Sequence, residues 1–169
     1  MMEQQKLVHP IPPTWDETSR ILILGSFPSV KSREMAYFYG HPQNRFWRVL
    51  SILFEEPFPE TKEERRAFLL RHHIAAWDVI ASCTITGSAD SSIRDVVVND
   101  LQPILACASI RQIYVNGKKA DALYRKYLFP QSGREAICLP STSPANAAWG
   151  IEELTAAWRQ ILDNLSPEE

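Results

Sequence analysis

Four short apolar runs along the chain predict buried β-strands. Each run is continuous rather than alternating, which is typical of strands whose two faces are both covered by other elements. The first run stops at a glycine, and polar segments follow the others closely. The four runs are Arg20–Gly25, Ile74–Ile80, Arg111–Val115 and Ala136–Leu139.

Between and after these runs, apolar residues recur at helical spacing and predict helices. Asn44 fits the N-cap of the first helix, and Thr61 with Glu64 forms a capping-box pattern at the second. Asn99 begins the third helix, where Pro103 is tolerated near the first turn. The five predicted helices are Phe46–Phe54, Thr61–His72, Asn99–Ile110, Gly117–Tyr127 and Gly150–Leu165.

The alternation of strands and helices predicts parallel strands joined by right-handed crossovers. We therefore expect an α/β fold, a three-layer α/β/α sandwich with a central, mostly parallel sheet. Ligands of such sheets bind outside the carboxyl ends of the strands. Three polar loops leave those ends, and we expect them to converge on one site: Ser26–Gln43, Ser82–Ser92 and Pro140–Ala148.

The length and composition agree with one compact domain. The chain has 169 residues, 45% of them hydrophobic and 22% charged, and shows neither a repeat nor a linker. We expect a single domain over residues 1–169. No apolar run is long enough to span a membrane, and the first residues lack the apolar core of a signal peptide. These features favour a cytoplasmic protein.

The cysteines and histidines do not form a recognisable metal or disulfide pattern. An odd number of widely spaced cysteines argues against a disulfide framework and a thiolate zinc site, and the histidines lack HExxH-like spacing. We expect neither a metal nor another cofactor. The residues concerned are Cys83, Cys107, Cys138, His9, His41, His72 and His73.

The net charge of −2 argues against a strongly basic nucleic-acid module. Its distribution matters more than its sum. The stretch Lys31–Arg48 carries four basic residues against one acidic, and Arg111–Arg134 carries six against one. The segment from Glu152 onward is acidic, with five acidic residues against one basic. Two basic segments permit a local anion-binding surface, although such runs are often only solvated faces.

Three motifs in the first and third loops are specific in combination. A GxxP turn, Gly25-Ser-Phe-Pro28, follows the first strand, and His41-Pro-Gln-Asn-Arg-Phe-Trp47 reads HPxNRFW. The third loop contains Ser143-Pro-Ala-Asn146. With Trp77-Asp-Val and the Ser82–Asp90 segment, this set resembles the uracil-DNA glycosylase superfamily, and its hypoxanthine-DNA glycosylase family most closely. The HPxNRFW element also resembles the mismatch-specific branch.

The resemblance extends from about Arg20 to Trp158 and implies an enzyme of base-excision repair. It implies a monofunctional DNA glycosylase that hydrolyses the N-glycosidic bond of deaminated bases, hypoxanthine first, with uracil and xanthine as further candidates. The implied partner is double-stranded DNA containing a damaged base, bound by a monomer. Two alternatives stay open: a mismatch-specific uracil-DNA glycosylase, and a non-catalytic nucleic-acid-binding module on the same fold, which the net acidity favours.

One departure from the superfamily concerns the attacking water. Most members carry an Asn or Asp in the turn after the first strand, where this chain has Ser26 and Phe27. The resemblance implies that Asn44 of HPxN takes over this catalytic role. A neutral amide can orient a water by accepting its hydrogen bond, and a strong base is not needed if the sugar cation forms first. The alternative is that Asn44 only caps the helix.

The resemblance also implies residues that bind the extruded base. Backbone N–H groups of Gly25 and Ser26 would stabilise charge on the leaving base. Phe27 or Tyr39 would stack on it, unless both only pack. In the second loop, Ser82 and Asp90 would read base edges or merely close a turn.

The remaining predicted contacts are to the DNA backbone and the gap left by the extruded nucleotide. Hydroxyl groups, backbone N–H groups and cationic side chains suit phosphate, and the Ser-Pro-Ala-Asn segment would enter the minor groove. The alternative for the Ser-Pro-Ala-Asn segment is a plain turn before the last helix, and the alternative for Lys118 is a solvated first turn of its helix. The residues are His41, Lys118, Ser141, Thr142, Ser143, Pro144, Ala145 and Asn146.

Overall fold

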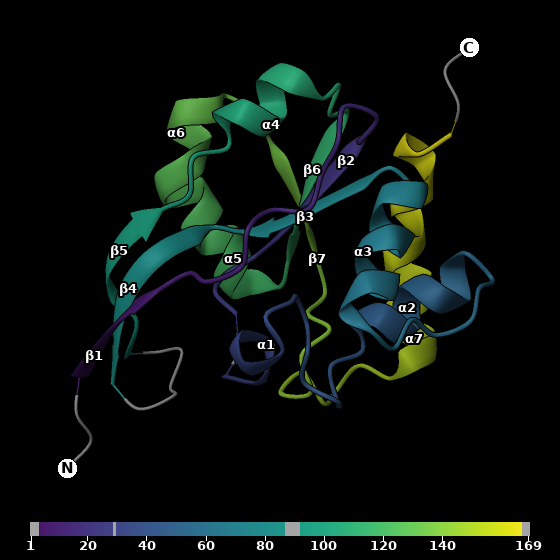
Figure 1. The fold of residues 1–169 in the computed structure, drawn as a ribbon, viewed down its shortest axis with the longest axis horizontal. Coiled ribbons are helices and arrows are strands. Elements are labelled where there is room, and N and C mark those ends of the chain that lie inside the picture. The colour runs from purple at the N-terminus through teal and green to yellow at the C-terminus, as the bar shows by residue number, and fades with distance from the viewer. Residues whose placement is uncertain (1–3, 29, 87–91, 167–169) are drawn as a thin grey trace.

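The computed structural model describes residues 4–28, 30–86 and 92–166. At its centre is a sheet of four parallel strands in the order β3-β2-β6-β7 (Figure 1). The predicted parallel sheet is thus confirmed, and all four predicted runs contribute to it. The strands are β2 (Ile21–Gly25), β3 (Ile74–Asp78), β6 (Gln112–Asn116) and β7 (Ala136–Leu139).

Helices cover both faces of this sheet (Figure 1). Alternate residues of β2 supply the two cores: Ile21 and Ile23 pack with α2, α3 and α7, whereas Leu22 and Leu24 pack with α4 and α5. Every residue of β2 is therefore buried, which explains its uninterrupted apolar run. The helices are α2 (Phe46–Leu53), α3 (Lys62–Arg71), α4 (Gln102–Cys107), α5 (Lys118–Leu123), α6 (Phe129–Ser132) and α7 (Ile151–Trp158).

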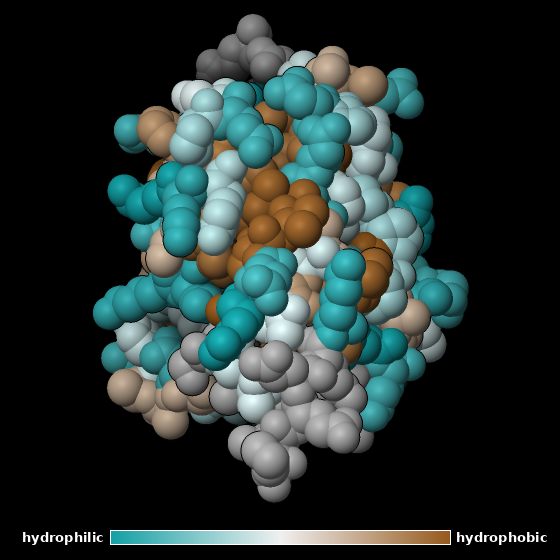
Figure 2. Space-filling model, turned by 90° about the vertical axis from the view of Figure 1, so that its left-hand side faces the viewer, coloured by the Kyte–Doolittle hydropathy of each residue, from teal (hydrophilic) through white to brown (hydrophobic). Residues whose placement is uncertain are grey.

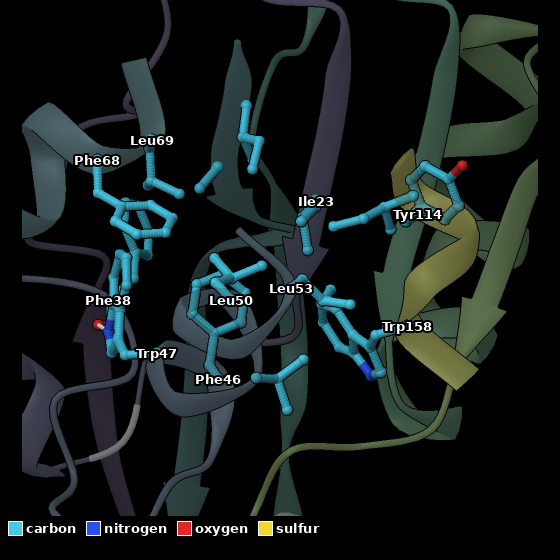
Figure 3. Close-up of a cluster of buried hydrophobic side chains, with 14 of the residues drawn as sticks. Ile23, Phe38, Phe46, Trp47, Leu50, Leu53, Phe68, Leu69, Tyr114 and Trp158 are labelled. Atoms are coloured by element: carbon cyan, nitrogen blue, oxygen red, sulfur yellow. Dashed lines mark hydrogen bonds between the residues drawn. The ribbon is translucent and has the colours of Figure 1, made fainter. Parts of the chain in front are cut away.

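Two buried tryptophans connect the core to the loops at the carboxyl ends of the strands. Trp47 in α2 and Trp158 in α7 belong to the cluster drawn in Figure 3. Each indole N–H donates to a backbone carbonyl, Trp47 to Phe38 at 3.0 Å and Trp158 to Pro140 at 2.9 Å. A buried indole N–H needs such a partner. These two bonds hold the segment before α2 and the segment after β7 on the core.

A second, antiparallel sheet of three strands was not predicted. Its order is β1-β4-β5, formed by Gln4–Val8, Ile80–Thr86 and Arg94–Val98. The predicted loop Ser82–Ser92 is wrong over its first half, because β4 continues to Thr86. The Ser and Thr residues of this segment favoured a loop. Thr, however, is common in strands, and the β4 residues Cys83 and Ile85 are buried.

The outer side of this second sheet is only partly covered. Figure 2 shows an apolar patch, bordered by hydrophilic residues, on the side of the molecule where α6 and β5 lie. Val97 in β5 and Phe129 in α6 are among the exposed large apolar side chains. In the part of the chain that the structure describes, no helix is both long enough and apolar enough to cross a membrane.

One helix was not predicted, and three others differ from the prediction. A short helix, α1 (Val30–Met35), lies inside the first predicted loop. The helix predicted from Asn99 begins at Gln102, because the Asn99 amide donates to the carbonyls of Asp78 and Ile80 instead of capping. The α5 helix continues as a π-helical turn, η2 (Tyr124–Leu128), and α7 as a 3₁₀ segment, η3 (Arg159–Asn164). The predicted capping box of Thr61 and Glu64 is confirmed.

Candidate active site

A cavity of about 930 Å³ opens at the carboxyl ends of the parallel strands. Its wall includes Gly25 at the end of β2, Asp78 at the end of β3 and Asn116 at the end of β6. The α1 helix and the segment after β7 lie at this same end of the sheet (Figure 1). Its place fits the rule for parallel sheets, and its size is within the range of small-molecule sites.

The first and third predicted loops converge on this cavity, as expected. Of the described part of the second predicted loop, Ile85 lines the cavity, as does Ile93 just after the loop. Ser82 lies in β4 opposite Val8, and neither Ser82 nor Pro144 is among the lining residues. Asp90 lies outside the described residues. The predicted residues that do line the cavity are Gly25, Ser26, Phe27, Tyr39, His41, Asn44, Lys118, Ser141, Thr142, Ser143, Ala145 and Asn146.

The Asn44 side chain is fixed by two hydrogen bonds to its oxygen. Oδ1 accepts from the Phe46 backbone N–H at 2.9 Å and from the Thr142 hydroxyl at 2.8 Å. Arg45, not Asn44, occupies the N-cap position of α2, so the predicted cap is displaced by one residue, but the Asn44 side chain still satisfies a free N–H of the first turn. Among the described residues, the Asn44 Nδ2 group has no partner.

The Thr142 hydroxyl links Asn44 to the end of β6. Thr142 is fully buried, and its backbone N–H donates to Asn116 Oδ1 at 3.1 Å. Asn116 Nδ2 in turn donates to Thr142 Oγ1 at 3.0 Å. Asn44 Oδ1 is an amide oxygen without a proton, so the Thr142 hydroxyl is the donor toward Asn44. The three side chains therefore form one directed network across the cavity wall.

Arg45 holds the third loop against the start of α2. Its guanidinium donates to the carbonyls of Ser143 and Asn146, each at 3.0 Å, and to the carbonyl of Trp149. Its backbone N–H also donates to the Thr142 carbonyl at 3.0 Å. A planar guanidinium presents several donors in a fixed arrangement, which suits this cluster of carbonyls. Arg45 therefore pairs within the protein.

The two predicted stacking residues, Phe27 and Tyr39, are both half-buried. The Phe27 and His9 rings are perpendicular, with centroids 5.8 Å apart, and the Arg33 guanidinium lies 5.8 Å from the Phe27 centroid. The Tyr39 ring already stacks on Phe46, with centroids 4.0 Å apart and planes 19° from parallel. One face of Tyr39 is therefore covered, and its hydroxyl lies close to Gly25.

The Tyr39 hydroxyl is buried without a hydrogen-bond partner among the described residues. Burial raises the pKa of this phenol strongly, and the negative charge of Asp78 raises it further, while the neighbouring Asn116 amide opposes the rise. The phenol therefore keeps its proton at neutral pH. Its backbone has φ of 53°, a left-handed conformation that is rare for a bulky residue.

Sequence reasoning missed a buried pair beside this hydroxyl, formed by His9 and Asp78. His9 Nε2 lies 2.7 Å from Asp78 Oδ2, and the two side chains are only 3% and 5% exposed. The Ile11 backbone N–H donates to His9 Nδ1 at 3.1 Å, which assigns the ring proton to Nε2. Asp78 could have been recognised from the sequence, because it is an acidic residue that follows an apolar run at the end of a parallel strand. His9 gave no such signal, because β1 was not predicted.

Asp78 explains why residue 25 is glycine. A β-carbon at Gly25 would lie 2.5 Å from Asp78 Oδ1 and 3.0 Å from the Tyr39 hydroxyl. Real β-carbons do not approach an oxygen so closely, so a side chain here would displace the carboxylate. The absence of a side chain leaves room for both the carboxylate and the phenol close to Gly25 at the cavity wall.

Among the described residues, Arg33, Lys118 and Lys119 bring cationic groups to the cavity. His41 lies there too, with Nδ1 accepting from the Gln43 backbone N–H at 3.0 Å, so one ring nitrogen fixes its own loop. Within residues 4–28, 30–86 and 92–166, no group of three or more His, Cys, Asp or Glu side chains is placed to hold a metal ion.

Comparison with known proteins gives consistent matches over most of the chain. The model of the uracil DNA glycosylase superfamily matches residues 12–162. Two curated relatives named hypoxanthine DNA glycosylase, from Methanosarcina acetivorans and Methanosarcina barkeri, are 36% and 35% identical over 137 residues. These matches cover 80% of this chain and 85% of each relative.

A solved structure is similar as well. The solution structure of a proposed uracil DNA glycosylase from Methanosarcina acetivorans has 32% sequence identity and a TM-score of 0.75, covering 92% of this chain and 99% of that one. The range matched by the superfamily model, residues 12–162, includes all four strands of the β3-β2-β6-β7 sheet. On this evidence, the chain belongs to the uracil DNA glycosylase superfamily.

Proposed function

We propose that this chain is a monofunctional DNA glycosylase of base-excision repair that removes deaminated bases, hypoxanthine first, with uracil and xanthine as further substrates. The observation that carries the proposal is the Asn44 amide, fixed at the wall of a cavity at the carboxyl ends of the strands. Membership of the superfamily and the two relatives named hypoxanthine DNA glycosylase support it.

In the proposed reaction, the nucleotide leaves the duplex and its base enters the cavity. The N-glycosidic bond breaks toward an oxocarbenium-like sugar, and a water then attacks C1′. Asn44 holds this water: the free Nδ2 group donates to it, while the bonds from Phe46 and Thr142 to Oδ1 keep the amide in place. Because the sugar is already cationic, the water needs orientation more than deprotonation.

The neighbouring groups fit the other needs of the reaction. Backbone N–H groups at Gly25 and Ser26 would stabilise the charge on the departing base. Phe27, whose ring is only half-buried, would stack on that base. A lysine that could form a Schiff base with the sugar is not required in this scheme, so the product is an abasic site.

The DNA contacts in the proposal come from the rim of the cavity. Lys118 and the hydroxyls of Ser141 and Ser143 would bind phosphate. The loop from Ser143 to Asn146, which Arg45 holds in place, would enter the minor groove with Pro144 at its tip. The proposed partner is double-stranded DNA. We also propose that the protein acts as a monomer, and the molar mass of the DNA complex from light scattering tests this.

The decisive experiment uses duplexes that carry a single deoxyinosine, deoxyuridine or deoxyxanthosine. After incubation with the protein, alkali cleaves the strand at any abasic site. We expect cleavage at deoxyinosine, and an intact strand when alkali is omitted. Cleavage at deoxyuridine alone would favour a mismatch-specific uracil glycosylase. Binding without cleavage of any duplex would favour a non-catalytic module.

A further inference from the structure

The Arg33 side chain is a cation at the cavity wall that the fold leaves without a partner. Arg33 belongs to α1, lines the cavity and is half-buried. Its Nε atom is buried without a hydrogen-bond partner, and no acidic side chain among the described residues pairs with the guanidinium. A buried donor without a partner costs free energy, and a cation removed from water costs more. Such a group at a cavity indicates that a bound anion completes it.

The protein surrounds this guanidinium with apolar groups. The guanidinium carbon lies 5.8 Å from the centroid of the Phe27 ring, and the face of an aromatic ring attracts a cation. Phe27 packs against the hydrophobic cluster that contains Cys83 and Ile85. Burial raises the pKa of the Cys83 thiol and the positive charge of Arg33 opposes this rise, so the guanidinium lies within electrostatic reach of β4. Little water screens a charge in this setting, so its attraction for an anion is strong.

These surroundings favour a flat, delocalised anion over a phosphate group. Phosphate oxygens are usually held by several hydroxyl, N–H and cationic donors together. The cavity offers such donors elsewhere, on α5 with Lys118 and on the segment after β7 with Ser141 and Ser143. Arg33 instead lies over the aromatic ring on which the extruded base would stack. A planar guanidinium can donate to the ring nitrogens of such a base.

We propose that Arg33 is a catalytic residue that binds the negative charge of the departing purine. This inference rests on the proposed function and adds a cation to the neutral groups assigned there. When the N-glycosidic bond breaks, both of its electrons stay on the base, whose five-membered ring then carries negative charge. The Arg33 N–H groups donate to that ring. Water forms the new bond to C1′, and the proton that it loses passes through solvent to the released base.

A fixed cation suits this step because the charge on the base develops only as the bond breaks. The intact nucleotide is neutral at the base and gains little from Arg33, whereas the departing anion gains much. The interaction therefore lowers the barrier more than it tightens substrate binding. No acidic side chain of the described residues neutralises Arg33 beforehand, so no ion pair has to break during the reaction. An arginine also keeps its charge at every pH at which the protein is folded.

The sharpest test compares two free bases that differ by one ring atom. In 8-azahypoxanthine a ring nitrogen replaces a CH group, and the base is largely an anion at neutral pH, whereas hypoxanthine is neutral there. Both dissociation constants are measured on the protein bound to a duplex with a tetrahydrofuran abasic analogue, which mimics the product complex. We expect the wild type to bind the anionic base roughly tenfold more tightly or better, and Arg33→Met to lose this preference. Arg33→Lys keeps the charge and should keep part of the preference.

The second readout is the single-turnover rate of excision from duplexes that carry deoxyinosine or 8-azadeoxyinosine. Hypoxanthine is the poorer leaving group, so its release depends more on Arg33. We expect Arg33→Met to slow excision of hypoxanthine roughly 100-fold, and that of 8-azahypoxanthine clearly less. Methionine removes a buried donor that has no partner, so the urea midpoint should not fall. Arg159→Met, at an exposed position of η3 outside the cavity, is the matched control.

The outcomes separate this inference from the proposed function. If Arg33→Met keeps the wild-type preference, or if the wild type has none, Arg33 does not bind the leaving base, whether or not the protein excises hypoxanthine. If the preference depends on Arg33 but no duplex is cleaved, the anion site stands and the enzymatic proposal fails. Weaker binding of the tetrahydrofuran duplex by Arg33→Met, with an unchanged preference between the bases, would assign Arg33 to a phosphate and overturn the inference. Equal slowing of both excision reactions would overturn its catalytic role.

Discussion

Replacing Thr142 by valine tests whether Asn44 depends on its neighbour for catalysis. The Thr142 hydroxyl is fully buried, accepts from Asn116 Nδ2 and donates to Asn44 Oδ1. Valine has a similar shape but removes both hydrogen bonds. At about 1 kcal/mol for each bond, Thr142→Val should lower the free energy of unfolding by about 2 kcal/mol. Asn44 then keeps only its bond from Phe46, and we expect roughly 10- to 100-fold slower excision.

The assay is single-turnover excision of hypoxanthine from a deoxyinosine duplex, with urea unfolding measured on the same samples. Thr155→Val is the matched control, because Thr155 is also buried and donates to the Ile151 carbonyl at 2.7 Å, outside the cavity. It should lose stability without losing rate. Thr142→Ser keeps the hydroxyl and should keep most of the rate. Wild-type excision by a destabilised Thr142→Val would refute the reasoning.

Three further predictions follow from the site. Asn44→Ala should excise roughly 100-fold more slowly or worse, with an unchanged circular dichroism spectrum and a stability loss of about 1 kcal/mol; near-normal turnover would remove Asn44 from catalysis. Gly25→Ala places a β-carbon 2.5 Å from Asp78 Oδ1, so excision and urea stability should both fall, and unchanged values would contradict the close approach. Stability should also fall as pH rises above about 10, because burial in the folded protein raises the pKa of four tyrosines above the ordinary value of about 10. Their contribution to stability is present below that value and is lost as pH climbs toward the folded pKa values, so a flat urea midpoint from pH 9 to 11 would argue against it. The four are Tyr37, Tyr39, Tyr114 and Tyr124.

The central sheet was predictable because its physical signal is local. Strands such as β2 are buried on both faces and therefore read as uninterrupted apolar runs. Strand β4 has a weaker signal, since its buried residues alternate irregularly and one of its two partners, β1, lies far away in the sequence. The antiparallel sheet was missed for that reason.

The candidate site, too, could be predicted from the sequence only where the signal is local. Residues on the first and third loops, such as Asn44 and Ser143, were found through motifs and strand ends. The pairing of His9 with Asp78 joins residues 69 positions apart, and it depends on a strand that the sequence did not predict. No pattern within one segment could have shown that a histidine near the start orients a carboxylate at the end of β3.

The bonds that Arg45 makes to Ser143, Asn146 and Trp149 also bear on protein engineering. They join segments about 100 positions apart, and the same residue follows directly on Asn44. A displacement of the 143–146 loop on contact with DNA would therefore also move Asn44, because Arg45 connects the two. A chimaera that borrows this loop from another glycosylase would have to import the matching HPxNR segment with it, because either half alone would be left without its counterpart.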